Sequence, residues 1–71
     1  MTDGELSTAA IHRLIEKAGA SRVGDGAVET LGEILENIAV QISKDAIDFA
    51  SHAGRRTVRS DDIKLAAKKF S

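Results

Sequence analysis

Apolar residues between Asp25 and Ala53 recur at intervals of three and four, the spacing that places side chains on one face of an α-helix. The positions on this face are Ala27, Leu31, Ile34, Leu35, Ile38, Ile42, Ala46, Phe49, Ala50 and Ala53. At about 1.5 Å per residue such a helix extends over roughly 40 Å, more than the diameter expected for so small a domain. We therefore expect one unbroken helix over residues 25–53, with an apolar face that a second chain covers.

A shorter amphipathic helix is predicted before this segment. Its apolar face consists of Ile11, Leu14, Ile15 and Ala18. Ser7 or Thr8 can cap its first turn by accepting a hydrogen bond from the backbone, and Gly19 is the residue type that ends helices. Residues 20–24 then form a loop, in which Arg22-Val23 is a candidate for a strand of two residues.

The chain after the long segment follows the same order of loop and helix. Gly54 is expected to end the long helix, and Ser60 is expected to cap a last one. The loop between them contains Thr57-Val58, a second candidate for a short strand. The apolar side of the last helix consists of Ile63, Ala66, Ala67 and Phe70. This pattern predicts an all-α fold of short helix, long helix and short helix.

The length of 71 residues allows one domain, which we expect to span residues 1–71 with a short N-terminal tail at residues 1–6. A chain this short buries only about 60% of its unfolded surface when it folds alone. It contains no cysteine for a disulfide, and two isolated histidines argue against a structural zinc site. Oligomerisation is the remaining source of stability.

The composition and the first residues together predict where the protein acts. The start of the chain is polar and acidic, without the apolar segment of a signal peptide or membrane anchor. The absence of cysteine is typical of a reducing compartment. We expect a soluble protein of the cytoplasm.

The charged residues are distributed unevenly, although ten basic and eleven acidic residues give a net charge of only -1. Between Asp25 and Ala53 there is a single basic residue, Lys44, beside six acidic ones. All five arginines lie outside that segment, at Arg13, Arg22, Arg55, Arg56 and Arg59. An isolated basic loop is often a solvated turn, yet three arginines within residues 54–59 form a candidate surface for an anionic partner.

No pattern in the chain is typical of an enzyme. The acidic residues are spread along helix faces, the glycines form no phosphate-binding motif, and no serine has a paired base. The two aromatic residues, Phe49 and Phe70, are expected in a core and not as platforms for single-stranded nucleic acid. We expect no catalytic residues, no metal, no cofactor and no small-molecule substrate.

Two stretches of the chain, together with this order of helices, closely resemble the archaeal histones. They are residues 18–23 (Ala-Gly-Ala-Ser-Arg-Val) and residues 52–63 (His-Ala-Gly-Arg-Arg-Thr-Val-Arg-Ser-Asp-Asp-Ile). The resemblance implies a histone fold, in which two identical or homologous chains cross their long helices in a handshake dimer. It also implies that Arg22-Val23 of one chain pairs with Thr57-Val58 of the other, and that dimers join into tetramers or longer stacks.

The partner that the resemblance implies is double-stranded DNA, which is bound, wrapped and compacted with little sequence specificity. Arg22 is then expected to enter the minor groove with Thr57 holding it, and the phosphate contacts are assigned to Arg13, Arg56 and Arg59. Arginine suits both roles, because its guanidinium group binds phosphate oxygens through two parallel hydrogen bonds. Such a protein is associated with the chromosome in the nucleoid.

The resemblance also assigns roles to residues away from DNA. Arg55 is expected to form a salt bridge with Asp62 that fixes the second loop against the last helix. Gly19 is expected to let neighbouring turns of a stack approach closely, and His52 to bond Asp62 of another dimer. The surface between dimers consists of Phe49, His52, Asp62 and Leu65. Taken alone, His52 is also explained by its position at the negative end of a helix dipole.

The chain departs from the family along the central helix. Where a basic residue is common it has Val28, Glu33, Val40 and Ser51, so we expect a reduced DNA affinity with a weaker salt dependence. The acidic helix also supports an alternative function, a histone-fold dimerisation subunit of a transcription or regulatory complex with weak or no DNA binding.

Overall fold

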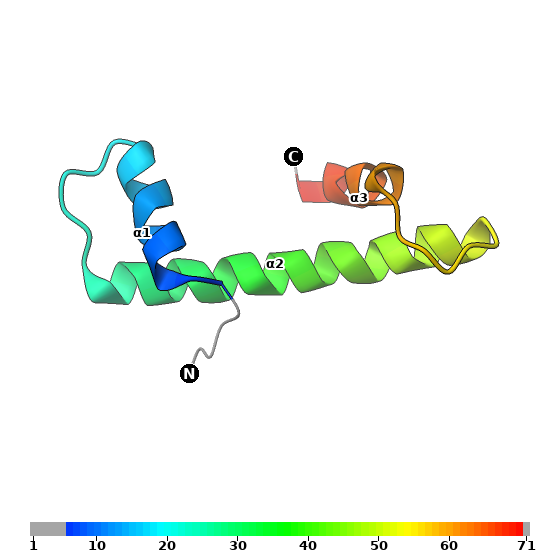
Figure 1. The fold of residues 1–71 in the computed structure, drawn as a ribbon, viewed down its shortest axis with the longest axis horizontal. Coiled ribbons are helices and arrows are strands. Elements are labelled where there is room, and N and C mark those ends of the chain that lie inside the picture. Colours follow the sequence, from blue (N-terminus) through cyan, green and yellow to red (C-terminus); the bar gives the residue numbers. More distant parts are fainter. Residues whose placement is uncertain (1–5, 71) are drawn as a thin grey trace. The chain divides into compact units, whose positions relative to one another are not determined.

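The computed structural model describes residues 6–70 of the chain, and these residues form helices without strands. Helix α1 spans Thr8–Lys17, α2 spans Asp25–His52, α3 spans Ser60–Ala67, and a 3-10 turn, η1, spans Lys68–Phe70 (Figure 1). The predicted all-α fold of short, long and short helices is therefore confirmed. Of the tail expected at residues 1–6, only Leu6 belongs to the described part of the chain.

The chain divides inside α2 into two compact units, Met1–Asn37 and Ile38–Ser71. The first unit contains α1, the loop that follows it and the N-terminal part of α2. The second contains the rest of α2, the loop of residues 53–59, α3 and η1. Each unit has a small core of its own.

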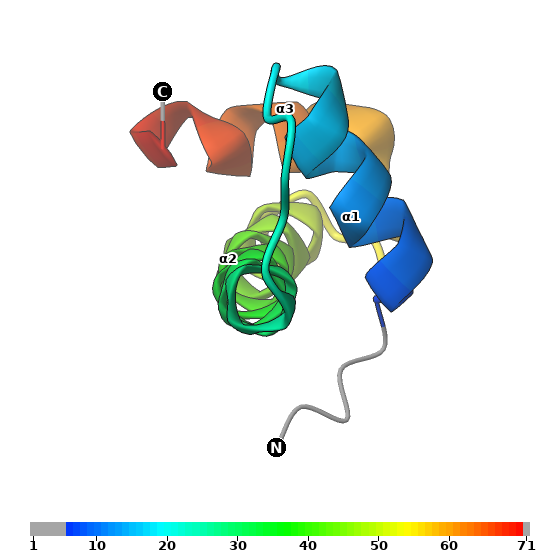
Figure 2. The same ribbon diagram turned by 90° about the vertical axis from the view of Figure 1, so that its left-hand side faces the viewer.

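In the first unit, α1 packs against the beginning of α2. Ile11 of α1 is only 3% exposed, and Val28 of α2 is also buried. Figure 2 shows α1 beside the first turns of α2, with the intervening loop returning the chain to the start of the longer helix. A Cβ atom added to Gly32 would lie 2.9 Å from Cδ1 of Ile11. Gly32 lowers the helix propensity of α2 but allows this close approach.

In the second unit, α3 packs against the last turns of α2 through small side chains. Ala46, Ala50 and Ala66 are buried. Because an alanine side chain buries little apolar area, these residues contribute only modestly to stability. An ion pair of 2.6 Å between Nζ of Lys69 and Oδ2 of Asp45 joins η1 to α2. This contact links residues far apart in the sequence, and no local pattern predicts it.

Both loops begin with the same hydrogen-bonded helix end. After α1, Gly19 has φ +118° and donates its N–H to Glu16 O, while Ala20 N–H donates to Ile15 O. After α2, Gly54 has φ +75°, with bonds from its own N–H to Ser51 O and from Arg55 N–H to Ala50 O. This is the Schellman arrangement, in which a residue with positive φ lets the chain satisfy the last carbonyls of the helix. The predicted helix-ending roles of both glycines have this physical basis.

The N-cap of α1 agrees with the sequence prediction, whereas the N-cap of α3 does not. Ser7 is the N-cap of α1, and its side-chain oxygen accepts a hydrogen bond of 3.2 Å from Ala10 N–H. At α3 the N-cap is Arg59, so Ser60 is the first helical residue and the prediction that it caps the helix was wrong. The capping bond comes instead from Asp62, whose Oδ2 accepts from Arg59 N–H at 2.8 Å.

The substitution Gly54→Ala should destabilise the protein by about 1 kcal/mol, because an L-residue is strained at φ +75°. Urea unfolding at a fixed protein concentration measures the change. Gly26→Ala is the matched control, since Gly26 lies inside α2, outside the left-handed region and with open space at its Cβ position. Equal stability of the two variants would contradict the role of Gly54 in ending α2.

Candidate nucleic-acid interface

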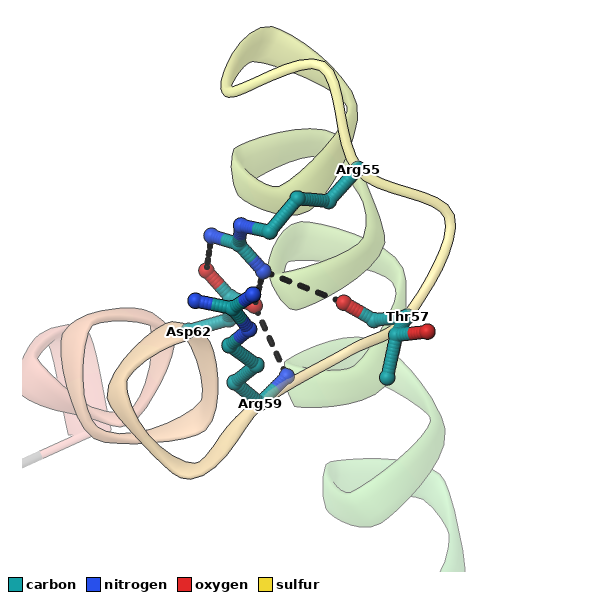
Figure 3. Close-up of polar contacts among 4 residues, drawn as sticks. All are labelled: Arg55, Thr57, Arg59 and Asp62. Carbon is teal, nitrogen blue, oxygen red and sulfur yellow. Dashed lines mark hydrogen bonds and ion pairs between the residues drawn. The ribbon is translucent and has the colours of Figure 1, made fainter.

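The loop between α2 and α3 is held by the side chain of Arg55. Its two terminal nitrogens donate to the carboxylate of Asp62, with Nη1 at 2.8 Å from Oδ2 and Nη2 at 2.9 Å from Oδ1 (Figure 3). Nη1 also donates to the backbone oxygen of Thr57 at 3.0 Å. The guanidinium group therefore joins the middle of the loop to the first turn of α3. Planar bidentate pairing of this kind is geometrically specific as well as strong.

The carboxylate of Asp62 is the centre of this arrangement. It is 5% exposed and accepts hydrogen bonds from Arg55 and from the backbone N–H of Arg59. The bonds from Arg55, then the bond from Arg59, lower the pKa of Asp62 from 3.8 to about 2, against the opposing effect of desolvation. The same bond raises the pKa of Arg55. Asp62 is therefore ionised over the whole physiological pH range.

The other arginine side chains of this loop remain available. Arg56 and Arg59 are exposed, and within the described residues neither side chain makes a hydrogen bond or ion pair. The Arg59 guanidinium lies near the Asp62 carboxylate, as Figure 3 shows, and contributes to lowering its pKa. The Arg55 guanidinium is thus bound within the chain. The Arg56 side chain is exposed to solvent.

In the first unit, Arg13 lies on α1 and Arg22 in the loop that follows. Both are exposed, and in the described part of the chain no hydrogen bond or ion pair holds either side chain. Lys17 follows Arg13 by one helical turn, and both border a shallow hollow beside the exposed Leu14. Lys17 is not among the predicted DNA contacts, although its spacing of four residues places it beside Arg13 on the surface of α1. Gly19 follows two residues after Lys17, just beyond the end of α1.

In the second unit, the residues assigned to a contact between dimers lie on α2 and α3. Phe49 and Leu65 are exposed and border one hollow, together with Asp45, Asp48 and Lys69. His52 is exposed in the last turn of α2, where its Nδ1 lies 2.9 Å from Asp48 O. This bond is consistent with the helix-end role of His52, while the contact with another dimer stays a prediction.

The described residues offer no centre for metal chemistry. Within residues 6–70, no three histidine, aspartate or glutamate side chains are arranged so that they could bind a metal ion. None of the helices there is sufficiently long and apolar to cross a membrane.

The helix order and the Arg55–Asp62 link define a histone-type fold. Residues 4–67 match the family described as histone-like transcription factor (CBF/NF-Y) and archaeal histone, and the chain belongs to this family. It is 52% identical to one of the subunits of archaeal histone HAN1 from Thermococcus zilligii over 64 residues, which are 90% of this chain and 96% of that protein.

More distant relatives are also histones. Probable archaeal histone 3 of Methanocaldococcus jannaschii is 42% identical over 64 residues, which are 90% of this chain and 96% of that protein. Histone H4 of Dictyostelium discoideum is 30% identical over 64 residues, which are 90% of this chain and 59% of that protein. The similarity to archaeal histones extends over nearly their full length.

The Asp62 carboxylate should make part of the stability pH-dependent. Because its folded-state pKa is depressed, its contribution is present above about pH 4 and is lost as the pH falls through about 2. Asp62→Asn should lower the urea midpoint at neutral pH, and the difference from the wild-type protein should shrink as the pH approaches 2. Asp61→Asn, at the exposed neighbouring position, should change the midpoint little. A wild-type to Asp62→Asn difference that stays constant down to pH 2 would contradict this account.

Proposed function

We propose that this protein is an archaeal-type histone that binds, wraps and compacts double-stranded DNA with little sequence specificity. The observation that carries the proposal is the loop after α2, in which Arg55 is bound to Asp62 while Arg56 remains free and exposed. Family membership and the names of the similar proteins support the same function. The role is structural, without catalysis, at the chromosome in the nucleoid.

The functional unit is a dimer. Large apolar side chains of α2 are exposed in the single chain, among them Ile34 at 49% and Ile47 at 54%. The buried residues of the second unit are mostly alanines, which supply little of the apolar burial that a stable fold needs. We propose that an identical or homologous chain covers the exposed residues in a handshake. Arg22-Val23 of one chain then pairs with Thr57-Val58 of the other.

The loop arginines supply the DNA contacts in this dimer. Arg22 enters the minor groove beside Thr57 of the partner chain, and Arg13, Arg56 and Arg59 bind phosphates. Histone octamers wrap DNA with minor-groove arginines and backbone contacts, without reading bases. Such contacts explain how a chain with net charge -1 can bind DNA, because its free cations lie in loops and on α1. The acidic α2 reduces the affinity, and Lys17 adds a further cation beside Arg13.

Dimers associate through the second unit. The apolar pair Phe49 and Leu65 supplies the contact area, with His52 and Asp62 as its polar partners. Gly19, which has no side chain, allows successive turns of a longer stack to approach each other. An assembly of several dimers presents several contact patches in a row, which wrapped DNA requires.

The substitution Arg22→Ala should weaken binding to duplex DNA and leave the protein folded and dimeric. Each cation contact that is lost should reduce the slope of log K against log salt by about one, so a homodimer, which loses Arg22 from both chains, should show a reduction of about two. Gel-shift titrations at several salt concentrations measure both quantities, and circular dichroism confirms the fold. Lys44→Ala is the control, since Lys44 lies on α2 away from the loops. Wild-type affinity of the Arg22 variant would count against the proposed interface.

Substitutions at the neighbouring residues Arg55 and Arg56 should have different effects, one on stability and the other on DNA binding. Arg56→Ala should weaken DNA binding severalfold with little change in the urea midpoint, because its side chain has no partner among the described residues. Arg55→Ala should lower the urea midpoint, because it leaves the buried Asp62 carboxylate without its main partner. Parallel unfolding and gel-shift measurements compare the two variants. A stable Arg55 variant, or a destabilised Arg56 variant, would contradict this division of roles.

A further inference from the structure

The C-terminal turn η1 is joined to α2 by an interaction between opposite charges. Nζ of Lys69 lies 2.6 Å from Oδ2 of Asp45, and the two side chains are 55% and 24% exposed. Oδ2 of Asp45 is itself shielded from solvent and accepts no hydrogen bond from the described residues. The contact is therefore an ion pair that lacks the orientation of a hydrogen bond. Its strength depends on the positive charge of Nζ, because no directional hydrogen bond contributes to it.

Apolar packing does little to hold η1 on α2. The buried apolar residues of α2 and α3 in this unit are alanines, at positions 46, 50 and 66. A hollow lies beside them, bordered by the exposed side chains of Phe49 and Leu65, by Asp48 of α2 and by Lys68 of η1. The α2 side of this hollow is acidic and the η1 side is basic. Attraction between these charges supplements the small apolar contact.

We propose that the Asp45–Lys69 ion pair is a charge-dependent link, and that Lys69 is a modification site at which acylation of Nζ releases η1 from α2. The acyl donor is a thioester. The ammonium group loses one proton to water, the resulting amine attacks the thioester carbonyl carbon, and a C–N bond forms while the C–S bond breaks. The thiol departs with the second proton, and the product is a neutral amide.

The neutral amide cannot replace the ammonium group beside Asp45. The carboxylate keeps its negative charge and Oδ2 is shielded from water, so loss of the cation leaves a buried charge without compensation. Separation of η1 from α2 hydrates the carboxylate and relieves this cost. The modified chain therefore has a detached η1 and a more exposed hollow beside Phe49 and Leu65.

Three other lysines lack such an internal partner. Lys17, Lys44 and Lys64 are exposed, and the described residues provide no hydrogen bond or ion pair for any of them. Acylation there removes a surface charge without breaking a contact within the chain. The Lys69 side chain is exposed enough for an acyl donor to reach it, and its charge has a specific partner on α2. Lys64, on α3, is the suitable control for the effect of charge alone.

Hydrogen exchange of the full chain, measured by mass spectrometry at one protein concentration, reports on the docking of η1. Lys69→Gln is neutral yet keeps N–H donors, and the amides of residues 66–70 should exchange about fivefold faster or more than in the wild-type protein. Lys69→Arg keeps the charge and should exchange at the wild-type rate. Lys64→Gln, the matched neutral change, should have no such effect. In Asp45→Asn, addition of Lys69→Gln should accelerate exchange no further.

Acetyl-coenzyme A tests the modification itself. Folded wild-type protein is incubated with this thioester, and peptide mass spectrometry locates the acetyl groups. Lys69 should be acetylated, and the molecules acetylated there should show the rapid exchange of Lys69→Gln. Equal exchange in Lys69→Gln and Lys64→Gln would overturn the charge-dependent link, and absence of acetyl groups from Lys69 would overturn the modification site. Neither outcome bears on the proposed DNA contacts, which gel-shift titration measures separately.

Discussion

The ion pair between Arg55 and Asp62 is the interaction on which the second unit depends. The carboxylate of Asp62 replaces a conventional side-chain cap at α3 by accepting from Arg59 N–H, and it holds the loop through Arg55, which also bonds Thr57 O. A carboxylate this buried requires nearly complete hydrogen bonding, because an unpaired buried charge is strongly unfavourable. The Asp62 carboxylate therefore fixes the loop conformation and caps the start of α3, and its own charge is compensated by the same hydrogen bonds. A substitution at Asp62 changes all three features together.

This constraint also determines which cations can act outside the chain. Arg55 is committed to an internal partner, so its charge contributes little to an external anion. Arg56, its neighbour, is exposed, and the rigid loop fixes the position from which its side chain extends. A cation on an ordered loop loses less conformational entropy on binding than one on a mobile segment. The overall charge of -1 is consequently a poor measure of DNA binding, because it counts internal and external charges alike.

The sequence predicts those features of the fold that depend on local interactions. The helices follow from apolar spacing, and Gly19 and Gly54 end them because few other residues adopt positive φ. The cap of α3 was wrongly assigned to Ser60, since the capping group is the Asp62 carboxylate, which is oriented by Arg55 from outside the helix. The Asp45–Lys69 ion pair joins two distant segments and has no local signature. The Arg55–Asp62 salt bridge was expected from the resemblance to archaeal histones. The spacing of the two residues in the sequence does not by itself predict it.

The exposed apolar side chains of α2 connect stability with function. If the core of each chain is too small to hold the fold firmly, the partner chain supplies the missing burial, and folding and dimerisation become one equilibrium. In the proposed handshake, Arg22 of one chain and Thr57 of the other form a single contact site for the minor groove. Neither chain alone then contains a complete DNA-binding surface. Any substitution that weakens the contact between chains should therefore reduce DNA binding without touching an arginine, since it removes the assembly in which the two loops meet.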